Sequence, residues 1–175
     1  TGEGTIAVLF SSNTVTSGAG NVTADNLAIV AEDDVTVNVN VTTLAIGIQV
    51  APLTADSNTD DAFVNVDTSV VEIGQYTSGQ RIALFNDNGN TELFTVSGTP
   101  TGENITLSSD PTINHQTSDN ATVSLDADIS VTHVGASDLT IGTVDGIVGI
   151  QNTSGTIELN VTNGGATFGQ NIGTN

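Results

Sequence analysis

Short apolar segments separated by polar corners run along most of this chain. They recur from Asn21 to Val50 and again from Ala127 to Gln170, and Gly, Asn or Asp closes each one. Between 35 and 41 the sequence VTVNVNV alternates with a period of two, which places its four valines on one face of a strand. No segment keeps a helical periodicity over about 10 to 15 residues. The pattern therefore predicts an all-β protein.

The middle of the chain has a different pattern. After the acidic connection Ala55–Asp61, apolar segments pair around turn sequences such as Asn86-Asp87-Asn88-Gly89-Asn90. Asn and Gly supply the positive φ angles of tight hairpins, and a second hairpin is expected between Phe94–Val96 and Ile105–Leu107. We therefore expect an antiparallel hairpin module at 66–126 between two strand-rich flanks, 1–65 and 127–175.

Two architectures fit the flanks. Apolar segments every 8 to 11 residues are typical of a solenoid, in which short strands stack in parallel to form a β-helix, or of a sandwich. The alternative is a jelly-roll-like β-sandwich whose N-terminal segment, 5–10, is donated to the sheet of a neighbouring copy.

The segments ADNLAIVAEDDVTVNVNVTTLA and SDLTIGTVDGIVGIQNTSGTIELNVTNGG resemble the repeats of filamentous-haemagglutinin-type adhesins and related giant surface proteins. The resemblance covers about half of the chain and rests on apolar segments and corner residues. It implies right-handed parallel β-helices with rungs of roughly twenty residues. The module at 66–126 departs from this pattern.

The charge of the chain excludes several partners. Twenty acidic residues face one cation, Arg81, and the formal net charge is −19. Such a surface repels nucleic acid and anionic membranes, and no apolar run approaches the ~20 residues of a membrane span. We expect no nucleic-acid binding, no membrane insertion, and a local role for Arg81 in neutralising nearby acids such as Glu92 or Glu103.

Calcium is the one cofactor that the sequence suggests. Hard oxygen ligands gather in two acidic turns, although neither turn has EF-hand spacing. The candidate ligands are Asp56, Asp60, Asp61, Asp87, Asn88 and Glu92.

Catalytic chemistry finds little support. The chain has no cysteine, and neither histidine lies in a nucleophile motif. His115 is expected in a turn, and His133 is expected as a strand residue at or near the surface. An Asn-Thr-Asp triplet like that of β-helical pectin hydrolases occurs at 58–60, but the accompanying Gly-His-Gly and Arg-Ile-Lys elements are missing. We predict that the protein is not an enzyme.

Six Asn-x-Ser/Thr sequons permit a glycosylated exterior. They begin at Asn21, Asn40, Asn104, Asn120, Asn152 and Asn160.

The sequence indicates an extracellular structural protein. The two ends share one strand-rich pattern and carry no charged or proline-rich cap, and unprotected β edges template further pairing. We expect copies of the chain to assemble end to end into a filament, or the chain to form a stalk segment of a larger adhesin. The alternative is a carbohydrate- or ligand-binding surface module, although 3% aromatic residues offer few platforms for sugar stacking.

Overall fold

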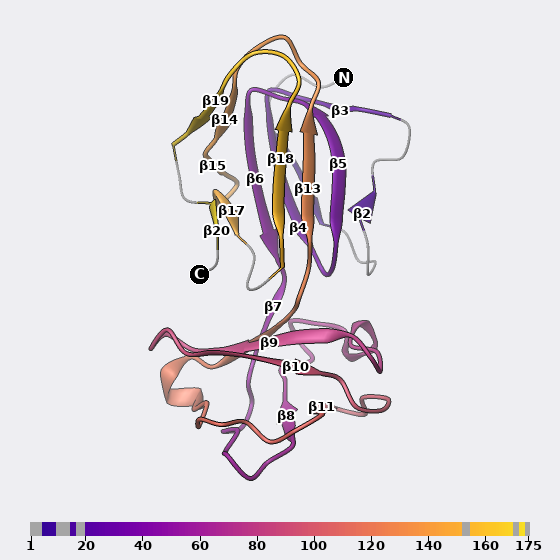
Figure 1. Ribbon diagram of the computed structural model, residues 1–175, viewed down its shortest axis with the longest axis vertical. Coiled ribbons are helices and arrows are strands. Elements are labelled where there is room, and N and C mark those ends of the chain that lie inside the picture. The colour runs from indigo at the N-terminus through magenta and orange to yellow at the C-terminus, as the bar shows by residue number, and fades with distance from the viewer. Residues whose placement is uncertain (1–4, 10–14, 17–19, 152–154, 170–171, 174–175) are drawn as a thin grey trace. The chain divides into compact units, whose positions relative to one another are not determined.

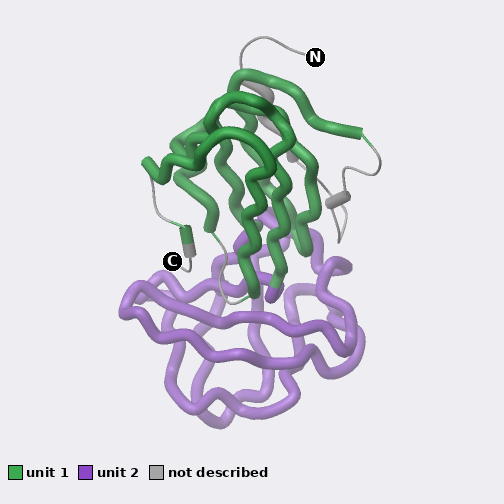
Figure 2. Tube along the Cα trace, turned by 45° about the horizontal axis from the view of Figure 1, so that its top comes forward, with its two compact units in different colours: residues 1–48, 127–175 green, residues 49–126 purple. Residues whose placement is uncertain are grey.

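The computed structural model describes residues 5–9, 15–16, 20–151, 155–169 and 172–173, and these residues form the all-β fold that the sequence predicts. The chain divides into two compact units (Figure 2). Unit 1 comprises Thr1–Ile48 and Ala127–Asn175, and unit 2 comprises Gln49–Asp126. Unit 2 is therefore an insertion within the sequence of unit 1.

Unit 1 contains two sheets in which every strand pair is parallel (Figure 1). The first sheet has the order β1-β4-β6-β14-β19, and β17 pairs with both β6 and β20. Its strands are β1 (Thr5–Leu9), β4 (Asn26–Ala31), β6 (Thr43–Ile48), β14 (Leu139–Ile141), β17 (Ile150–Gln151), β19 (Ala166–Phe168) and β20 (Ile172–Gly173).

The second sheet has the order β18-β13-β5-β2, with β3 also paired to β5. Its strands are β2 (Val15–Thr16), β3 (Val22–Thr23), β5 (Val35–Asn40), β13 (Ile129–His133) and β18 (Ile157–Val161). The chain visits the two sheets in turn, so each strand stacks on the strand two steps earlier. This winding is the β-helix-like arrangement predicted for the flanks.

Register keeps the apolar positions in rows. Leu27 pairs with Leu44 and Ile29 with Ile46 in the first sheet, while Val35 pairs with Ile129 in the second. The valines at 35, 37 and 39 are buried and the intervening residues are not, as the alternating sequence predicts. These rows meet in one core between the sheets.

A small antiparallel hairpin interrupts the winding between β14 and β17. It consists of β15 (Thr143–Val144) and β16 (Ile147–Val148), joined by Asp145 and Gly146 at φ 51° and 83°. Val144 and Ile147 pack against Ala28 and Ala45 of the first sheet.

Unit 2 is antiparallel. One sheet has the order β10-β9-β12-β7 and a second pairs β11 with β8. The strands are β7 (Val50–Pro52), β8 (Phe63–Asn65), β9 (Arg81–Phe85), β10 (Thr91–Thr95), β11 (Asn104–Thr106) and β12 (Thr122–Leu125), and two 3-10 turns are η1 (Ile73–Gln75) and η2 (Thr117–Asp119). The core of this unit surrounds Tyr76, Ile82 and Val123.

The hairpin expected at Asn86–Asn90 is present as β9 and β10. The second expected hairpin is reduced to a bridge between Val96 and Leu107, because β11 pairs instead with β8. That pairing also moves a boundary. The sequence suggested a division at 65/66, whereas unit 2 begins at Gln49, since β7 pairs with β12 and β8 with β11.

The N-terminal segment 5–10 was the candidate donor strand of the sandwich alternative. Thr5–Leu9 forms β1, which pairs in parallel with β4 of its own chain, and Phe10 lies outside the described residues. The flanks are thus stacked parallel strands and not an antiparallel sandwich.

Candidate functional site

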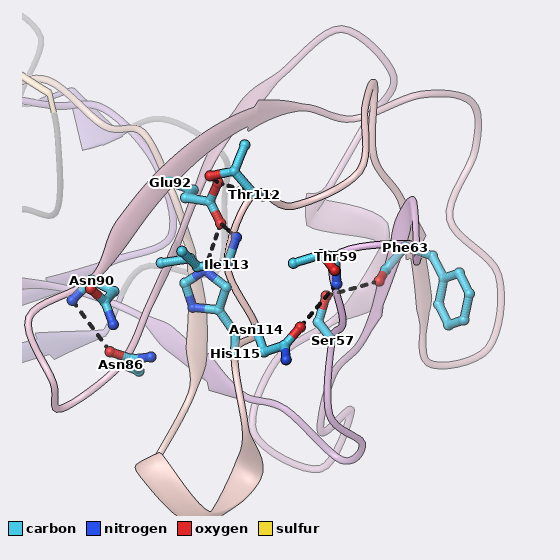
Figure 3. A network of polar contacts seen from close by, with 10 residues as sticks. All are labelled: Ser57, Thr59, Phe63, Asn86, Asn90, Glu92, Thr112, Ile113, Asn114 and His115. Carbon is cyan, nitrogen blue, oxygen red and sulfur yellow. Dashed lines mark hydrogen bonds and ion pairs between the residues drawn. The ribbon is translucent and has the colours of Figure 1, made fainter.

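A partly buried polar network in unit 2 centres on Glu92 and His115 (Figure 3). In the β9–β10 ladder Glu92 pairs with Leu84 and Phe94 pairs with Ile82. Residues two apart on a strand share a face, so Glu92 lies on the same side of the sheet as the buried Phe94. The strand therefore places the Glu92 carboxylate, whose side chain is 14% exposed, on the core-facing side of the sheet.

Hydrogen bonds from one loop satisfy this carboxylate. Thr112 donates from Oγ1 (2.6 Å) and from its backbone N (2.8 Å) to Oε1 of Glu92. Oε2 accepts from the Ile113 backbone N at 3.4 Å and contacts Nε2 of His115 at 3.0 Å. Burial acts to raise the pKa of Glu92, but the hydrogen bonds from Thr112, His115 and Ile113 outweigh it and hold the pKa below its ordinary value.

The His115 side chain is fully buried, at 0% exposure, and the Glu92 side chain is 14% exposed. Because a carboxylate only accepts, Nε2 of His115 carries the proton of this contact. The backbones of His115 and Ser57 bond reciprocally, with N···O distances of 2.8 and 2.9 Å. Nδ1 of His115 is buried without a hydrogen-bond partner among the described residues.

Ser57, His115 and Glu92 are residue types found in hydrolase triads, so their geometry matters. Oγ of Ser57 donates to the carbonyl of Phe63 at 3.4 Å, and Figure 3 shows that hydroxyl on the Phe63 side. Nε2 of His115 is engaged by Glu92. A serine nucleophile needs a base nitrogen within hydrogen-bond reach of its hydroxyl. The contacts instead join the segment around Ser57 to the loop at 112–115, and that loop to Glu92 of β10. Thr59 N donates to Asn114 Oδ1 at 3.1 Å.

The predicted calcium ligands serve mainly as acceptors for nearby loops. Asp56 accepts from the Thr117 backbone N and hydroxyl, which lowers the pKa of Asp56 in that order of effect. Asp61 accepts from the backbone and side chain of Asn58. Glu92 belongs to the network above.

The remaining three candidate calcium ligands are Asp60, Asp87 and Asn88. Asp87 accepts from Nδ2 of Asn120 at 2.6 Å, Asn88 donates its backbone N to Asn86 Oδ1 at 3.1 Å, and Asp60 is exposed. Over the described ranges, no three acidic, histidine or cysteine side chains are placed to hold a metal ion. Calcium binding by the two acidic turns stays a prediction.

Two further expectations from the sequence need correction. Arg81 pairs through Nη1 with Oδ2 of Asp126 at 3.0 Å, and not with Glu92 or Glu103. Register explains this, because Arg81 lies at the end of β9 beside the end of β12. His133, expected near the surface, is fully buried, with Nε2 3.1 Å from the Val41 carbonyl oxygen.

The sequon asparagines lie in varied surroundings. Asn21, Asn120 and Asn160 are exposed, Asn40 and Asn104 are half-buried, and Asn152 lies outside the described residues.

The open edges of unit 1 form the second candidate site. Within the described part of the chain, β1 ends one side of the first sheet and β19 with β20 ends the other. Phe168 of β19 is 57% exposed and Ile172 of β20 is 37% exposed. On β18 the core-contacting Ile157, Leu159 and Val161 are half-buried, whereas Ile129 and Val131 of the adjacent β13 are buried.

The last strands of the two sheets, β18 in one and β19 with β20 in the other, thus leave apolar side chains uncovered. Backbone donors and acceptors of such edges can pair with another strand. Among the described residues, no helix has the length and apolar character needed to cross a membrane.

No family model matches the chain, and no curated protein matches it. The resemblance to filamentous-haemagglutinin-type adhesins stays a prediction. Solved structures similar to the chain include the gp54 tailspike of Acinetobacter baumannii bacteriophage AP22 in complex with A. baumannii capsular saccharide, at 12% identity and a TM-score of 0.38, over 80% of this chain and 29% of that one.

Two other phage tailspikes are also similar. Gp61 of Pseudomonas phage phi297 has 10% identity and a TM-score of 0.35, over 82% of this chain and 29% of that one. Gp49 of Pseudomonas phage LKA1 has 12% identity and a TM-score of 0.36, over 89% of this chain and 30% of that one. The chain therefore spans less than a third of the length of each tailspike to which it is similar.

Proposed function

We propose that this protein is an extracellular structural module whose copies assemble end to end into a filament, or which serves as one stalk segment of a larger surface adhesin. The observation that carries the proposal is the pair of open parallel ladders in unit 1. Each turn of the chain adds one parallel strand to each sheet. Among the described strands, both ends of each sheet can still pair with a further strand.

The composition of the edge strands supports this role. Soluble proteins guard exposed edges with charged residues, proline or bulges. β1 has the sequence TIAVL and β19 has the sequence ATF, neither with a charge or a proline. The nearby β18 carries one charge, at Glu158. Heterologous contacts between two different edges extend into a filament when the rotation between copies does not close a ring.

The net charge of −19 opposes association of identical chains. Salt shortens the range of that repulsion, to a Debye length of about 3 Å at 1 M. Assembly should therefore increase with ionic strength. Divalent cations screen the repulsion in the same way without a dedicated site, so calcium chloride and sodium chloride at equal ionic strength should promote assembly equally.

Negative-stain microscopy and light scattering of the purified chain across 0.05–1 M salt test the proposal. We expect filaments that lengthen with salt. Phe168→Lys places a charge on the open edge and should abolish them, whereas Phe63→Lys alters an exposed phenylalanine of unit 2 and should not. A monodisperse monomer under every condition, or filaments unaffected by Phe168→Lys, would contradict end-to-end assembly through this edge.

No catalytic role is proposed, because the Ser57, His115 and Glu92 contacts hold loops together. The rival role, carbohydrate or ligand binding, is tested with the same preparations on a glycan array. Saturable binding by a chain that remains monomeric would favour the rival over assembly.

A further inference from the structure

The order in which the chain visits the two sheets constrains how copies can stack. Among the described strands the winding runs β1, β2 with β3, β4, β5, β6, β13, β14 with β17, β18, and β19 with β20. The first and last of these steps both belong to the first sheet. The number of steps is therefore odd, and the step that would follow β19 and β20 belongs to the second sheet, beside β18.

We propose that the β1 strand of a second copy takes this place beside β18, so that the two sheets exchange roles from one copy to the next. This inference rests on the proposed function and specifies its interface. The β2 and β3 strands of the second copy then lie beside β19 and β20. Successive copies are related by a half-turn about the winding axis, and every new strand pair is parallel like those in the two stacked sheets of unit 1.

Strand lengths match in this arrangement. β1 and β18 are continuous strands of five residues each. β2 and β3 form an interrupted strand of two and two residues, and β19 and β20 form another of three and two. Stacking without the half-turn would instead place the five residues of β1 on the interrupted β19 and β20. It would also leave one level of the second sheet unfilled above β18.

Burial points to the same partner. Ile157, Leu159 and Val161 pack against the core but stay half-buried, because no described strand covers the outer side of β18. A strand of TIAVL adds apolar residues to this row. In the ladder with β4, Ile6 and Val8 pair with the buried Leu27 and Ile29.

Register follows from continuing the core row. Placing Ile6 on Ile157 and Val8 on Leu159 sets Ala7 beside Glu158 and Leu9 beside Asn160. Adjacent strands lie within reach of a disulfide, since its Cα atoms are about 4.4–6.8 Å apart. Packed sheets lie about 10 Å apart, beyond that reach. The chain has no native cysteine, so any disulfide that forms must join the engineered cysteines.

The test mixes two single-cysteine proteins under oxidising conditions and scores covalent dimers. Ala7→Cys with Glu158→Cys should cross-link efficiently, and Leu9→Cys with Asn160→Cys provides a second pair in case Ala7→Cys misfolds. Ala7→Cys with Thr167→Cys, which reports stacking of first sheet on first sheet, should not. Each single variant alone, checked by circular dichroism and microscopy, gives the background for random collision.

Each outcome bears on one claim. Cross-linking of 7 with 158 but not with 167 supports the alternating stack, and the reverse pattern overturns it while leaving end-to-end assembly intact. Filaments of the unmodified chain without either cross-link show that another surface mediates assembly, which also overturns the inference. A chain that never assembles overturns the end-to-end assembly on which this inference rests.

Discussion

Val35 and Ile129 are neighbours in a parallel ladder although the whole of unit 2 lies between them in the sequence. The backbone N of Val35 donates to the Asp128 carbonyl oxygen at 2.8 Å, so the contact begins at the first residues after the insertion. The parallel stacking resumes in register after the insertion. A new strand needs only the backbone of the strand before it to pair with, and apolar side chains that continue the core. An insertion at a corner between strands disturbs neither.

Removal of unit 2 should therefore leave a folded unit 1. Ala31 pairs with Ile48 and Val35 pairs with Ile129, so the corner of residues 32–34 has a counterpart between Ile48 and Ile129. Deleting 50–126 leaves Gln49, Ala127 and Asp128 there, the same number of residues. We expect a strand-rich circular dichroism spectrum and a cooperative thermal transition. Deleting 50–128 leaves one residue for that corner and should prevent folding; equal stability of the two deletions would contradict the register.

The excised segment 49–126 should fold alone as well. Val50 pairs with Ser124, so the ends of unit 2 are adjacent strands, and the unit has its own core. A chain whose ends meet and whose core is internal can be cut out without losing contacts. Dispersed amide resonances and protection from hydrogen exchange in β9 and β12 would confirm this. A spectrum typical of an unfolded chain would show that unit 2 depends on unit 1.

Much of unit 1 could be predicted from its sequence. The alternation at 35–41 gave both the strand β5 and the residues that it buries, since a period of two leaves one arrangement with the valines inside. Parallel pairing could not be separated from a sandwich, because both use short strands with the same spacing. The choice between the two folds depends on pairing between residues that are distant in the sequence, such as Thr5 with Asn26.

The network in unit 2 was missed for a related reason. Glu92 appeared as one acid of a turn, and His115 as a turn residue. A usable signal was present, because Glu92 alternates with Phe94 along one strand and therefore shares its inward face. The partner could not be found in this way, since His115 reaches Glu92 only through the bridge between His115 and Ser57.

The lowered pKa of Glu92 predicts a loss of stability in acid. A carboxyl group whose pKa is lower in the folded state stabilises the fold above its unfolded pKa of about 4.3, and this contribution disappears as pH falls through the folded value. Glu92→Gln should cost about 1–3 kcal/mol at neutral pH, since Thr112 and the buried His115 lose a charged acceptor. Between pH 6 and pH 3 the difference from the unmodified chain should shrink.

Urea unfolding at several pH values measures this effect, and Asp110→Asn is a suitable control because it removes one negative charge from an exposed residue. The control should stay near the unmodified chain throughout. A constant difference between Glu92→Gln and the unmodified chain across this pH range would contradict a lowered pKa at Glu92.

Two glycines of unit 1 separate steric crowding from backbone strain. Gly164 and Gly146 have positive φ angles of 78° and 83°, so alanine is strained at both. A Cβ at Gly164 would lie 2.7 Å from the Ser137 carbonyl oxygen, whereas a Cβ at Gly146 meets no atom within 4 Å. Gly146→Ala should lower the free energy of unfolding by about 1 kcal/mol. Gly164→Ala should lower it clearly more, because the backbone must also shift.

Thermal unfolding of the 50–126 deletion carrying each change gives the comparison, with a shift in midpoint of about 4–8 °C per kcal/mol for a domain of this size. Equal midpoints would show that Gly164 has room for a side chain and that the β18–β19 corner is looser than its contacts indicate.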